Sequence, residues 1–308
     1  MSKILVSGLV NIETNVRIRQ FPINYYPIDY DFFGVKSSVG GVGYNLSKSL
    51  STLGDSVCLV SYLGNDFEAQ HIEQELSKAE IDTKYILHQL KETPTSAILY
   101  DENGKCQIYC DLKDIQEKTY PSNEVNLSEF DLLAICNINF NRQLLKQAKS
   151  MGKTIATDVH VLSNINDEYN LDFMECADIL FLSHEGINGE PLEFLLSLAT
   201  KYNNSIIVLS QGSKGVLMYV KGDNCVYQVD CVPNDNIVNT VGAGDSLFSS
   251  FLHYYAKGVS PIQSIKLAQT FASHKISFNG ASVGFYTEEE LMQDFNSKSI
   301  NHTVIPLQ

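Results

Sequence analysis

The feature that most constrains the fold is a regular alternation of short apolar runs with helical segments. Leu132–Ile138 reads Leu-Leu-Ala-Ile-Cys-Asn-Ile, a run typical of a strand buried on both faces. Asp66–Ala79 and Arg142–Met151 have helical patterns. This alternation predicts an α/β fold with a doubly wound, mostly parallel central sheet flanked by helices. The other predicted strands are Ile4–Val10, Ser56–Tyr62, Thr154–Val159, Asp178–Leu182 and Ile206–Leu209.

Two segments interrupt the alternation. Val16–Ser38 is rich in Tyr, Phe, Ile and Pro and lacks helical periodicity. Thr95–Leu112 holds two strand-like runs around Asn103-Gly104, a dipeptide typical of hairpin turns. We therefore expect a single domain over residues 1–308, with a small β lid whose strands are inserted from about 14–38 and 93–114. Such a lid either closes over a site or simply covers part of the core.

Charge and cysteine usage exclude several classes of function. The formal net charge is −14, so a nucleic-acid partner is not expected. The first apolar run meets Asn11 and Glu13 too early for a signal peptide or membrane helix, and no apolar stretch reaches 18 residues. The seven cysteines form no C-x-x-C pair. We read them as reduced thiols in a cytoplasmic protein without a membrane partner.

The most informative motif is Asn239-Thr-Val-Gly-Ala-Gly-Asp245, which runs into an apolar helical pattern ending near Gly258. The small residues Gly242, Ala243 and Gly244 then lie at a helix N-terminus, where free backbone N–H groups and the helix dipole favour an anion. Asp245 falls in the same turn. A carboxylate beside a bound phosphoryl group can accept the proton of an attacking hydroxyl. Alone, Gly-x-Gly-Asp would favour a helix-terminal carboxylate; the whole run is more specific.

This run resembles the C-terminal signature of the ribokinase-like (PfkB) carbohydrate kinases. The resemblance implies that Asp245 is the catalytic base and that the Ala243-Gly244 amides form an anion hole. A second motif, Ser37-Ser-Val-Gly-Gly-Val-Gly-Tyr-Asn45, is a glycine-rich turn feeding a helix. It does not complete a dinucleotide fingerprint, because Leu46 occupies the last glycine position. It resembles the di-glycine signature of the same family, which implies sugar contacts at Gly40, Gly41 and Asn45.

Further matches follow in family order over about residues 5–285. Asn11, Glu13 and Asn137 match positions that contact the acceptor, with Glu13 in place of the usual Asp. The Ser183-His184-Glu185 region implies a weak role for Glu185 near Mg²⁺, although His184 stands where Asn is usual. Asn239 replaces a cation-supporting Asp, so K⁺ is a possible rather than an expected cofactor. The nucleotide-binding positions implied for ATP are Ser210, Gly212, Gly215, Gly242, Gly280 and Ala281.

The expected activity is therefore ATP-dependent phosphorylation of a hydroxymethyl group on a small sugar or nucleoside. Within the family the sequence looks most similar to pseudouridine kinases, with ribokinase or fructokinase activity as the alternative. A non-catalytic sugar- or nucleoside-binding regulator on the same fold is a second class. No P-loop motif is present, and among the histidines only His160, at a predicted strand end, is kept as a possible substrate contact. Lid strands in this family often pair between subunits, which implies a homodimer.

Overall fold

The computed structural model describes residues 1–102 and 105–307 and has two sheets. Within these residues the main sheet has ten strands, in the order β14-β13-β12-β11-β10-β9-β8-β1-β4-β5. The seven strands from β11 to β5 in this order are parallel, and β12, β13 and β14 continue the sheet in antiparallel fashion. The strands are β1 Lys3–Ser7, β4 Ser56–Leu63, β5 Asp82–His88, β8 Leu132–Ile135, β9 Ile155–Val161, β10 Ile179–Ser183, β11 Ile206–Ser210, β12 Val216–Val220, β13 Cys225–Val229 and β14 His302–Pro306.

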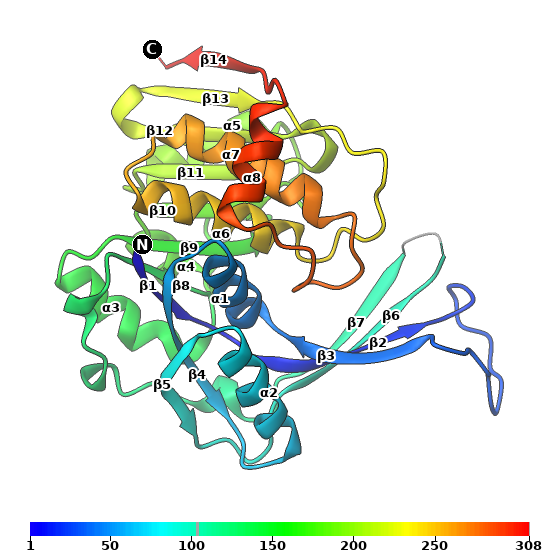
Figure 1. The fold of residues 1–308 in the computed structure, drawn as a ribbon. Coiled ribbons are helices and arrows are strands. Elements are labelled where there is room, and N and C mark those ends of the chain that lie inside the picture. Colours follow the sequence, from blue (N-terminus) through cyan, green and yellow to red (C-terminus); the bar gives the residue numbers. More distant parts are fainter. Residues whose placement is uncertain (103–104, 308) are drawn as a thin grey trace.

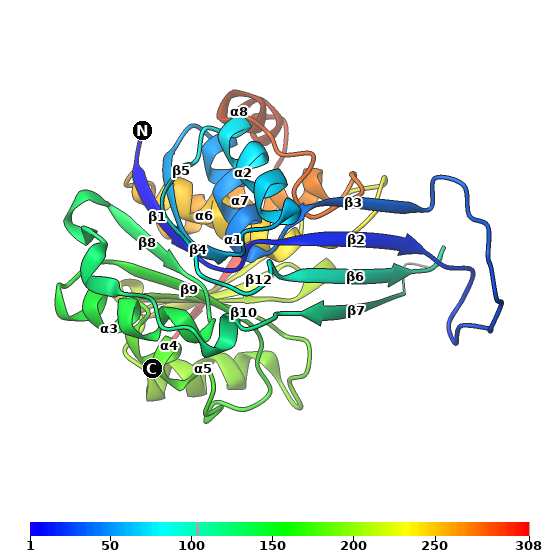
Figure 2. The same cartoon turned by 90° about the horizontal axis from the view of Figure 1, so that it is seen from below.

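Helices cover both faces of the main sheet (Figures 1 and 2). One core cluster joins the sheet to α1, α2, α6 and α7, and the other joins it to α3, α4 and α5. The predicted doubly wound, mostly parallel architecture is therefore confirmed. The helices are α1 Val42–Thr52, α2 Phe67–Lys78, α3 Arg142–Ser150, α4 Leu171–Cys176, α5 Pro191–Lys201, α6 Ala243–Ala256, α7 Pro261–Lys275 and α8 Glu288–Asn296.

Local sequence signals account for several helix ends. The Asp66 side chain accepts the backbone N–H of Ala69 at 3.0 Å, which caps α2. Thr287 and Glu290 form a reciprocal capping box at the start of α8. Pro191 and Pro261 occupy the first positions of α5 and α7, where a missing N–H costs nothing. Among the described residues, no helix combines the length and apolarity needed to cross a membrane.

A second, smaller sheet extends away from the main body (Figures 1 and 2). Its strand order is β3-β2-β6-β7, with β2 Asn11–Arg17, β3 Val35–Gly40, β6 Thr95–Tyr100 and β7 Cys106–Asp111. The predicted hairpin is present as the antiparallel β6–β7 pair, while its Asn103-Gly104 turn lies outside the described residues. The first lid segment, predicted over about 14–38, is wider in the structure: β2 begins at Asn11 and β3 ends at Gly40.

Two predicted strands are too long. Ile4–Val10 stops at Ser7, because the chain then leaves the main sheet and enters the small one at Asn11. The strand predicted over Leu132–Ile138 ends at Ile135. Beyond it, the side-chain amide of the buried Asn141 donates hydrogen bonds to the carbonyls of Cys136 and Ser7, at 2.8 and 2.9 Å, in place of a neighbouring strand. The C-terminal tail, left open between loose and docked, pairs with β13 as β14.

Candidate active site

The candidate site lies where the order of the parallel strands reverses. β1 stands between β4 and β8, and the chain winds outward from it in both directions. In open α/β sheets, ligands bind beyond the carboxyl ends of strands at such a switch point. Asn11 follows β1, Asn137 follows β8, and Asp158 and His160 lie in the middle and near the end of β9. The fold therefore gathers polar side chains from distant parts of the sequence at one edge.

The start of α6 leaves backbone donors open. Its N-cap Gly242 has φ 80°, and a Cβ there would lie 2.6 Å from the carbonyl oxygen of Ala281, so only glycine fits. The Ala243 N–H is used in a turn, donating to the Thr240 carbonyl at 3.1 Å. In the described part of the chain, the N–H groups of Gly244 and Asp245 have no acceptor. A Cβ on Gly244 would meet nothing within 4 Å, so an anion has room there.

Asp245 is joined to α1 across 200 residues of sequence. The Asn45 side chain donates to Oδ2 of Asp245 at 2.7 Å. One turn further on, the buried hydroxyls of Ser49 and Ser249 share a hydrogen bond of 2.7 Å, which keeps the two helices close. The two sequence motifs therefore meet at one point, as the resemblance implied.

Burial raises the pKa of Asp245 above its ordinary value of 3.8. The charge of His160 and the Asn45 hydrogen bond act against that rise, while Asp158 adds to it. His160 has φ 58°, a left-handed conformation uncommon outside glycine, and its N–H donates to Oδ1 of Asp158 at 2.8 Å. The end of β9 thus places one imidazole and one carboxylate near Asp245.

The first strand of the small sheet supplies Asn11 and Glu13. Glu13 accepts the Gly41 N–H at 3.3 Å, and its carboxylate fills the space where a Cβ on Gly40 would lie. Burial raises the pKa of Glu13, the Gly41 N–H opposes the rise, and Asp245 adds to it. Asn11 is 2% exposed and donates to Ser96 at 2.8 Å. Gly41 is required by protein packing, because it has φ 86° and a Cβ there would lie 2.6 Å from the Leu9 carbonyl oxygen, whereas a Cβ on Gly40 would displace only the Glu13 carboxylate.

Two buried amide oxygens at this site have no partner. Oδ1 of Asn11 and Oδ1 of Asn45 receive no hydrogen bond in the described structure. The residues are 2% and 3% exposed. A buried acceptor without a donor is costly. Asn137, by contrast, donates to Oδ1 of Asn170 at 3.0 Å and is already engaged.

The predicted nucleotide residues lie further along the same edge. Ser210 ends β11, and the turn Gly212–Lys214 leads into β12. Gly215, at φ 85°, is required because a Cβ would lie 2.0 Å from the Val229 carbonyl oxygen. Glu185 is exposed. It lies near the end of β11, because the N–H of the preceding residue, His184, donates to the Ser210 carbonyl at 2.9 Å.

Gly280 and Ala281 follow α7 and reach the start of α6. Ala281 contacts Gly242, and the Asn239 amide donates to Oδ1 of Asn279 at 2.9 Å. Gly280 has φ 114°. The α6 loop and the late loop predicted from the sequence are therefore packed together.

Sequence reasoning missed two residues beside Asp245. Asp158 carried a readable signal, because a carboxylate near the carboxyl end of an apolar parallel strand points to the ligand edge. Lys275 carried none: it lies at the end of α7, is 0% exposed, and donates to the Val241 carbonyl. Its helical position alone would have suggested a surface lysine.

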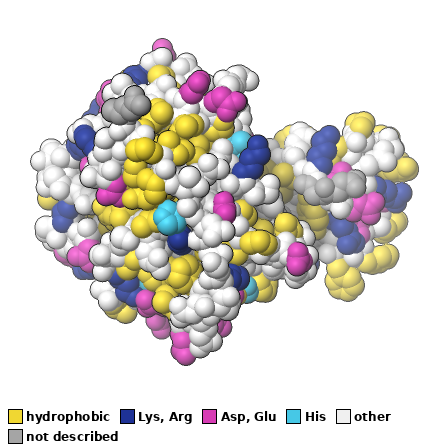
Figure 3. All heavy atoms as spheres, turned by 90° about the horizontal axis from the view of Figure 1, so that it is seen from above, with side chains coloured by type: hydrophobic (Ala, Val, Ile, Leu, Met, Phe, Trp, Pro, Cys, Tyr) yellow, Lys and Arg dark blue, Asp and Glu magenta, His cyan; other side chains and the backbone are white. Residues whose placement is uncertain are grey.

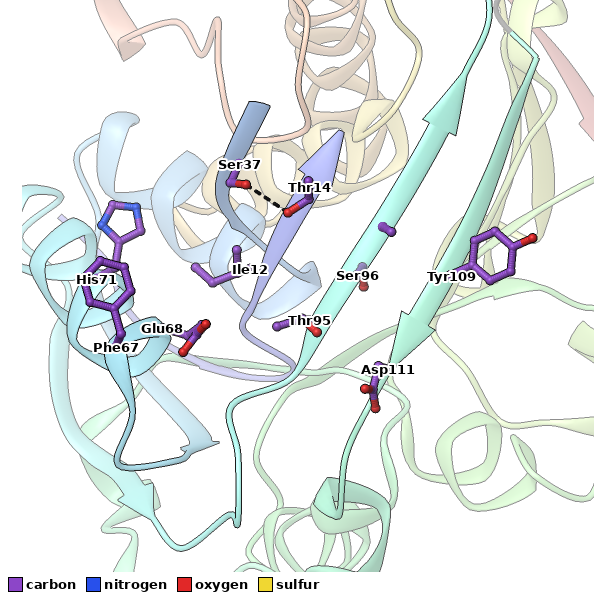
Figure 4. Close-up of a pocket in the computed structure, with 11 residues that line it drawn as sticks. Ile12, Thr14, Ser37, Phe67, Glu68, His71, Thr95, Ser96, Tyr109 and Asp111 are labelled. Atoms are coloured by element: carbon purple, nitrogen blue, oxygen red, sulfur yellow. Dashed lines mark hydrogen bonds between the residues drawn. The ribbon is translucent and has the colours of Figure 1, made fainter. Parts of the chain in front are cut away.

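A hollow lies between the small sheet and α2 (Figure 4). Side chains alternate along β2, so Asn11 and Glu13 face the Asp245 side while Ile12 and Thr14 face this hollow. It has a volume of about 660 Å³. Phe67 and His71 of α2 form its other wall. The sheet therefore separates this hollow from the candidate site.

Metal ligands are not clustered at the site. Over residues 1–102 and 105–307, no group of three or more His, Cys, Asp or Glu side chains is arranged to hold a metal ion. Glu185 stands as a single exposed carboxylate. Mg²⁺ is commonly held by one or two carboxylates together with substrate phosphates, and a single carboxylate at the nucleotide edge fits that arrangement.

Comparisons with known proteins give the family. The model of the pfkB family carbohydrate kinases matches residues 1–287. A nucleoside kinase of Methanothermobacter thermautotrophicus is 26% identical over 78% of this chain and 77% of its own length. A ribokinase of Dictyostelium discoideum is 23% identical over 83% and 89%. The solved structure of Arabidopsis thaliana ribokinase complexed with ribose and ATP has a TM-score of 0.80 at 18% identity, covering 96% of this chain and 98% of its own. This chain belongs to the pfkB family of carbohydrate kinases.

Proposed function

We propose that this kinase transfers the γ-phosphoryl group of ATP to a hydroxymethyl group on a neutral sugar or nucleoside, with Asp245 as the general base. One observation carries the proposal. The Asp245 carboxylate stands beside two backbone N–H groups without acceptors, at the N-terminus of α6. An anion site and a base in the same helical turn are what in-line phosphoryl transfer to a hydroxyl requires.

The chain's own groups divide the work as follows. Asn45 binds Oδ2 of Asp245 and fixes the orientation of the carboxylate, which leaves Oδ1 to accept the hydroxyl proton. The acceptor oxygen bonds to the γ-phosphorus as the bond to the oxygen of ADP breaks. The Gly244 and Asp245 N–H groups hold the charge of the phosphoryl oxygens during transfer. The unpartnered oxygens of Asn11 and Asn45 accept hydroxyl groups of the sugar.

The charges around Asp245 argue for a neutral acceptor. Asp158 raises the pKa of Asp245, and Asp245 raises the pKa of Glu13, so these carboxylates repel one another. The ammonium of Lys275 donates to the Val241 carbonyl and forms no ion pair with a carboxylate in the described residues. A carboxylate or phosphate on the acceptor would meet like charges in a poorly solvated site, where repulsion is strong. This favours sugars and nucleosides over sugar acids and sugar phosphates.

Pseudouridine remains our first candidate from sequence, with ribose, fructose and other nucleosides as alternatives. The two sequence relatives described above are named nucleoside kinase and ribokinase. Both substrate types share a ribose ring with a hydroxymethyl group. The buried oxygens of Asn11 and Asn45 suit the ring hydroxyls that both types present.

ATP would lie along the edge formed by Ser210, Gly212, Gly215, Gly280 and Ala281, with its terminal phosphate at Gly244. Mg²⁺ would neutralise phosphate charge, with Glu185 as the candidate protein ligand. This placement is supported by the backbone N–H of His184, the residue before Glu185, which donates to the Ser210 carbonyl at 2.9 Å.

We also propose a homodimer formed through the small sheet, in a reducing cytoplasmic compartment. The connection between β2 and β3 exposes a concentrated set of apolar side chains, and Figure 3 shows apolar surface at this end of the molecule. Isolated monomers rarely expose large apolar patches. The exposed residues are Ile23, Tyr25, Tyr26, Ile28, Tyr30, Phe32 and Phe33.

The test is ATP-dependent ADP release with pseudouridine, ribose, fructose, adenosine, inosine and uridine, for wild type and Asp245→Asn. We expect turnover of one neutral compound and a loss of roughly 10²–10⁴-fold in the folded variant. Sugar phosphates and sugar acids serve as negative controls. If no compound is turned over but one raises the melting temperature equally in both proteins, the chain is a binding protein and the base assignment is wrong.

A further inference from the structure

A buried lysine lies behind the loop that presents the anion site. Lys275 is 0% exposed at the C-terminal end of α7. Its ammonium donates to the carbonyl of Val241, the residue directly before Gly242-Ala243-Gly244. Among the described residues, Lys275 forms no ion pair with a carboxylate. An unpaired buried ammonium is expensive and needs a reason.

The surroundings of Lys275 tie it to the loop. The Ile276 carbonyl accepts the N–H groups of Val238 and Asn239 at 2.9 and 3.1 Å. Oδ1 of Asn239 then accepts the Val241 N–H at 2.8 Å. The backbone at the end of α7 therefore bonds to Val238 and Asn239, and the Lys275 side chain bonds to the Val241 carbonyl two residues further along the same loop. The C-terminal dipole of α7 also favours a positive charge at this place.

The charge of Lys275 reaches the reacting groups. Asp245 is the charged group whose field acts on Lys275, and Lys275 in turn lowers the pKa of Asp245. During transfer, negative phosphoryl oxygens would arrive at the Gly244 and Asp245 N–H groups, next to the Asp245 carboxylate. A fixed positive charge behind this loop stabilises that concentration of negative charge without having to reorganise.

We propose that Lys275 is a positioning residue and a built-in cation, which orients the Val241–Gly244 loop and makes turnover independent of monovalent cations. In other proteins, backbone carbonyl oxygens coordinate K⁺. The Val241 carbonyl is a group of this kind. The ammonium already provides a cation at this carbonyl. This inference rests on the proposed function for the reaction it supports.

The first arm of the experiment needs no variant. Turnover of the wild type is measured at constant ionic strength in KCl, NaCl and tetramethylammonium chloride. We expect rates within about twofold, because the cation is covalently part of the chain. A rate that rises several-fold with K⁺ concentration would overturn the proposal.

The second arm compares Lys275→Met with Lys266→Met. Lys266 lies on the same helix and is only partly buried, so its replacement removes the same charge from a different place. We expect Lys275→Met to lower kcat at least tenfold with little change in the KM of the acceptor, and Lys266→Met to leave both unchanged. Lys275→Ala should regain turnover with added ammonium or methylammonium. A folded Lys275→Met variant with wild-type kcat and pH profile contradicts the proposal.

A third arm separates this inference from the proposed function. Burial lowers the pKa of Lys275 to about 8, and Asp245 opposes that change. In protein labelled with ¹³C at lysine side chains, one resonance that disappears in Lys275→Arg should titrate near that pH, with or without turnover. The rate should fall as pH rises through the same range, because the ammonium is lost. A Lys275 resonance that titrates as an ordinary exposed lysine overturns the inference even if the kinase assignment stands. A Lys275 resonance that titrates near pH 8, together with no kinase activity in the panel, overturns only the proposed function.

Discussion

At the scale of single residues, the site places carboxylates where burial disfavours their charged form. Asp245 and Glu13 both have pKa values raised by burial, and the charge of Asp245 adds to the rise at Glu13. A raised folded-state pKa means that the ionised form destabilises the fold at neutral pH. Function and stability therefore oppose each other at this point of the chain.

This opposition predicts the pH behaviour of Asp245→Asn. Above the raised pKa the wild type carries a buried charge that the variant lacks, so the variant should have the higher melting temperature at pH 7. The difference should shrink as pH falls, because the folded protein then takes up the proton on Asp245. Catalysis should be lost over the same fall in pH, at a higher pH than for an ordinary aspartate. Thermal unfolding and kcat/KM between pH 4 and 8 measure both.

Asp66 provides the control of opposite sign. Burial raises its pKa, but hydrogen bonds from Thr93 and Ala69 outweigh burial and lower it overall. The stability that its ionised form contributes is therefore present at neutral pH and is lost as pH falls. Asp66→Asn should lower the melting temperature at pH 7. If both variants shift it in the same direction, the charge argument for Asp245 is wrong.

The sequence singled out the candidate site residues that belong to a recognisable local motif. Asp245 follows Gly242-Ala243-Gly244 at a helix start, and Asn45 stands two positions after Gly43 in the first turn of α1. Their 2.7 Å contact is a finding of the structure. Lys275 has no local pattern, because its burial comes from the packing of α7 against a loop more than 30 positions earlier in the sequence. Contacts of that kind are settled by tertiary packing and cannot be read from one segment.

At the scale of elements, the glycines near the site fall into two kinds. Gly43 lies in the first turn of α1, where a Cβ would come within 2.8 Å of the Gly8 carbonyl group. That neighbour is backbone and cannot move aside easily. Gly244 lies in the first turn of α6 and faces open space. Gly43 is therefore needed for packing, whereas Gly244 keeps the space at the start of α6 open for a ligand.

The pair predicts opposite outcomes for the same substitution. Gly43→Ala should destabilise the protein by about 1–3 kcal/mol through overpacking. Gly244→Ala should leave stability unchanged or raise it by up to about 1 kcal/mol, since alanine is the better helix former. It should nevertheless weaken turnover, because its methyl group enters the proposed anion site. Denaturant unfolding and ATP kinetics separate the two; a stable Gly244→Ala with full activity would remove Gly244 from the site.

Strands were predicted well where their apolar runs are continuous, as in β4, β10 and β11. The end of β1 was not predicted correctly. Gly8, Leu9 and Val10 continue the apolar run, although the chain has already left the main sheet and enters the small sheet at Asn11. β14 was not predicted as a strand, because an edge strand that pairs only with β13 needs no continuous hydrophobic pattern.

At the scale of the whole molecule, the exposed residues at the end of the small sheet remain without a partner in one chain. Phe33 is 93% exposed and Tyr25 is 88% exposed, on a segment between β2 and β3. Burying such side chains contributes about 1.5–3 kcal/mol each, which is ample for association when several are buried together. The homodimer proposed above would bury them in both copies.

This predicts a concentration-dependent dimer that depends on the lid segment. The variant Phe32→Ser with Phe33→Ser should shift the mass seen by light scattering from about two chains toward one, at micromolar concentration. Met151→Ser, at an exposed apolar position on the main body, should leave the mass unchanged. If the two-site variant becomes monomeric but keeps its kcat and KM, the lid of one subunit closes its own site without help. If both also fall, the paired lids exclude water from the reaction together. A wild type that is monomeric at all accessible concentrations contradicts the dimer and leaves the aromatic segment to act within one chain.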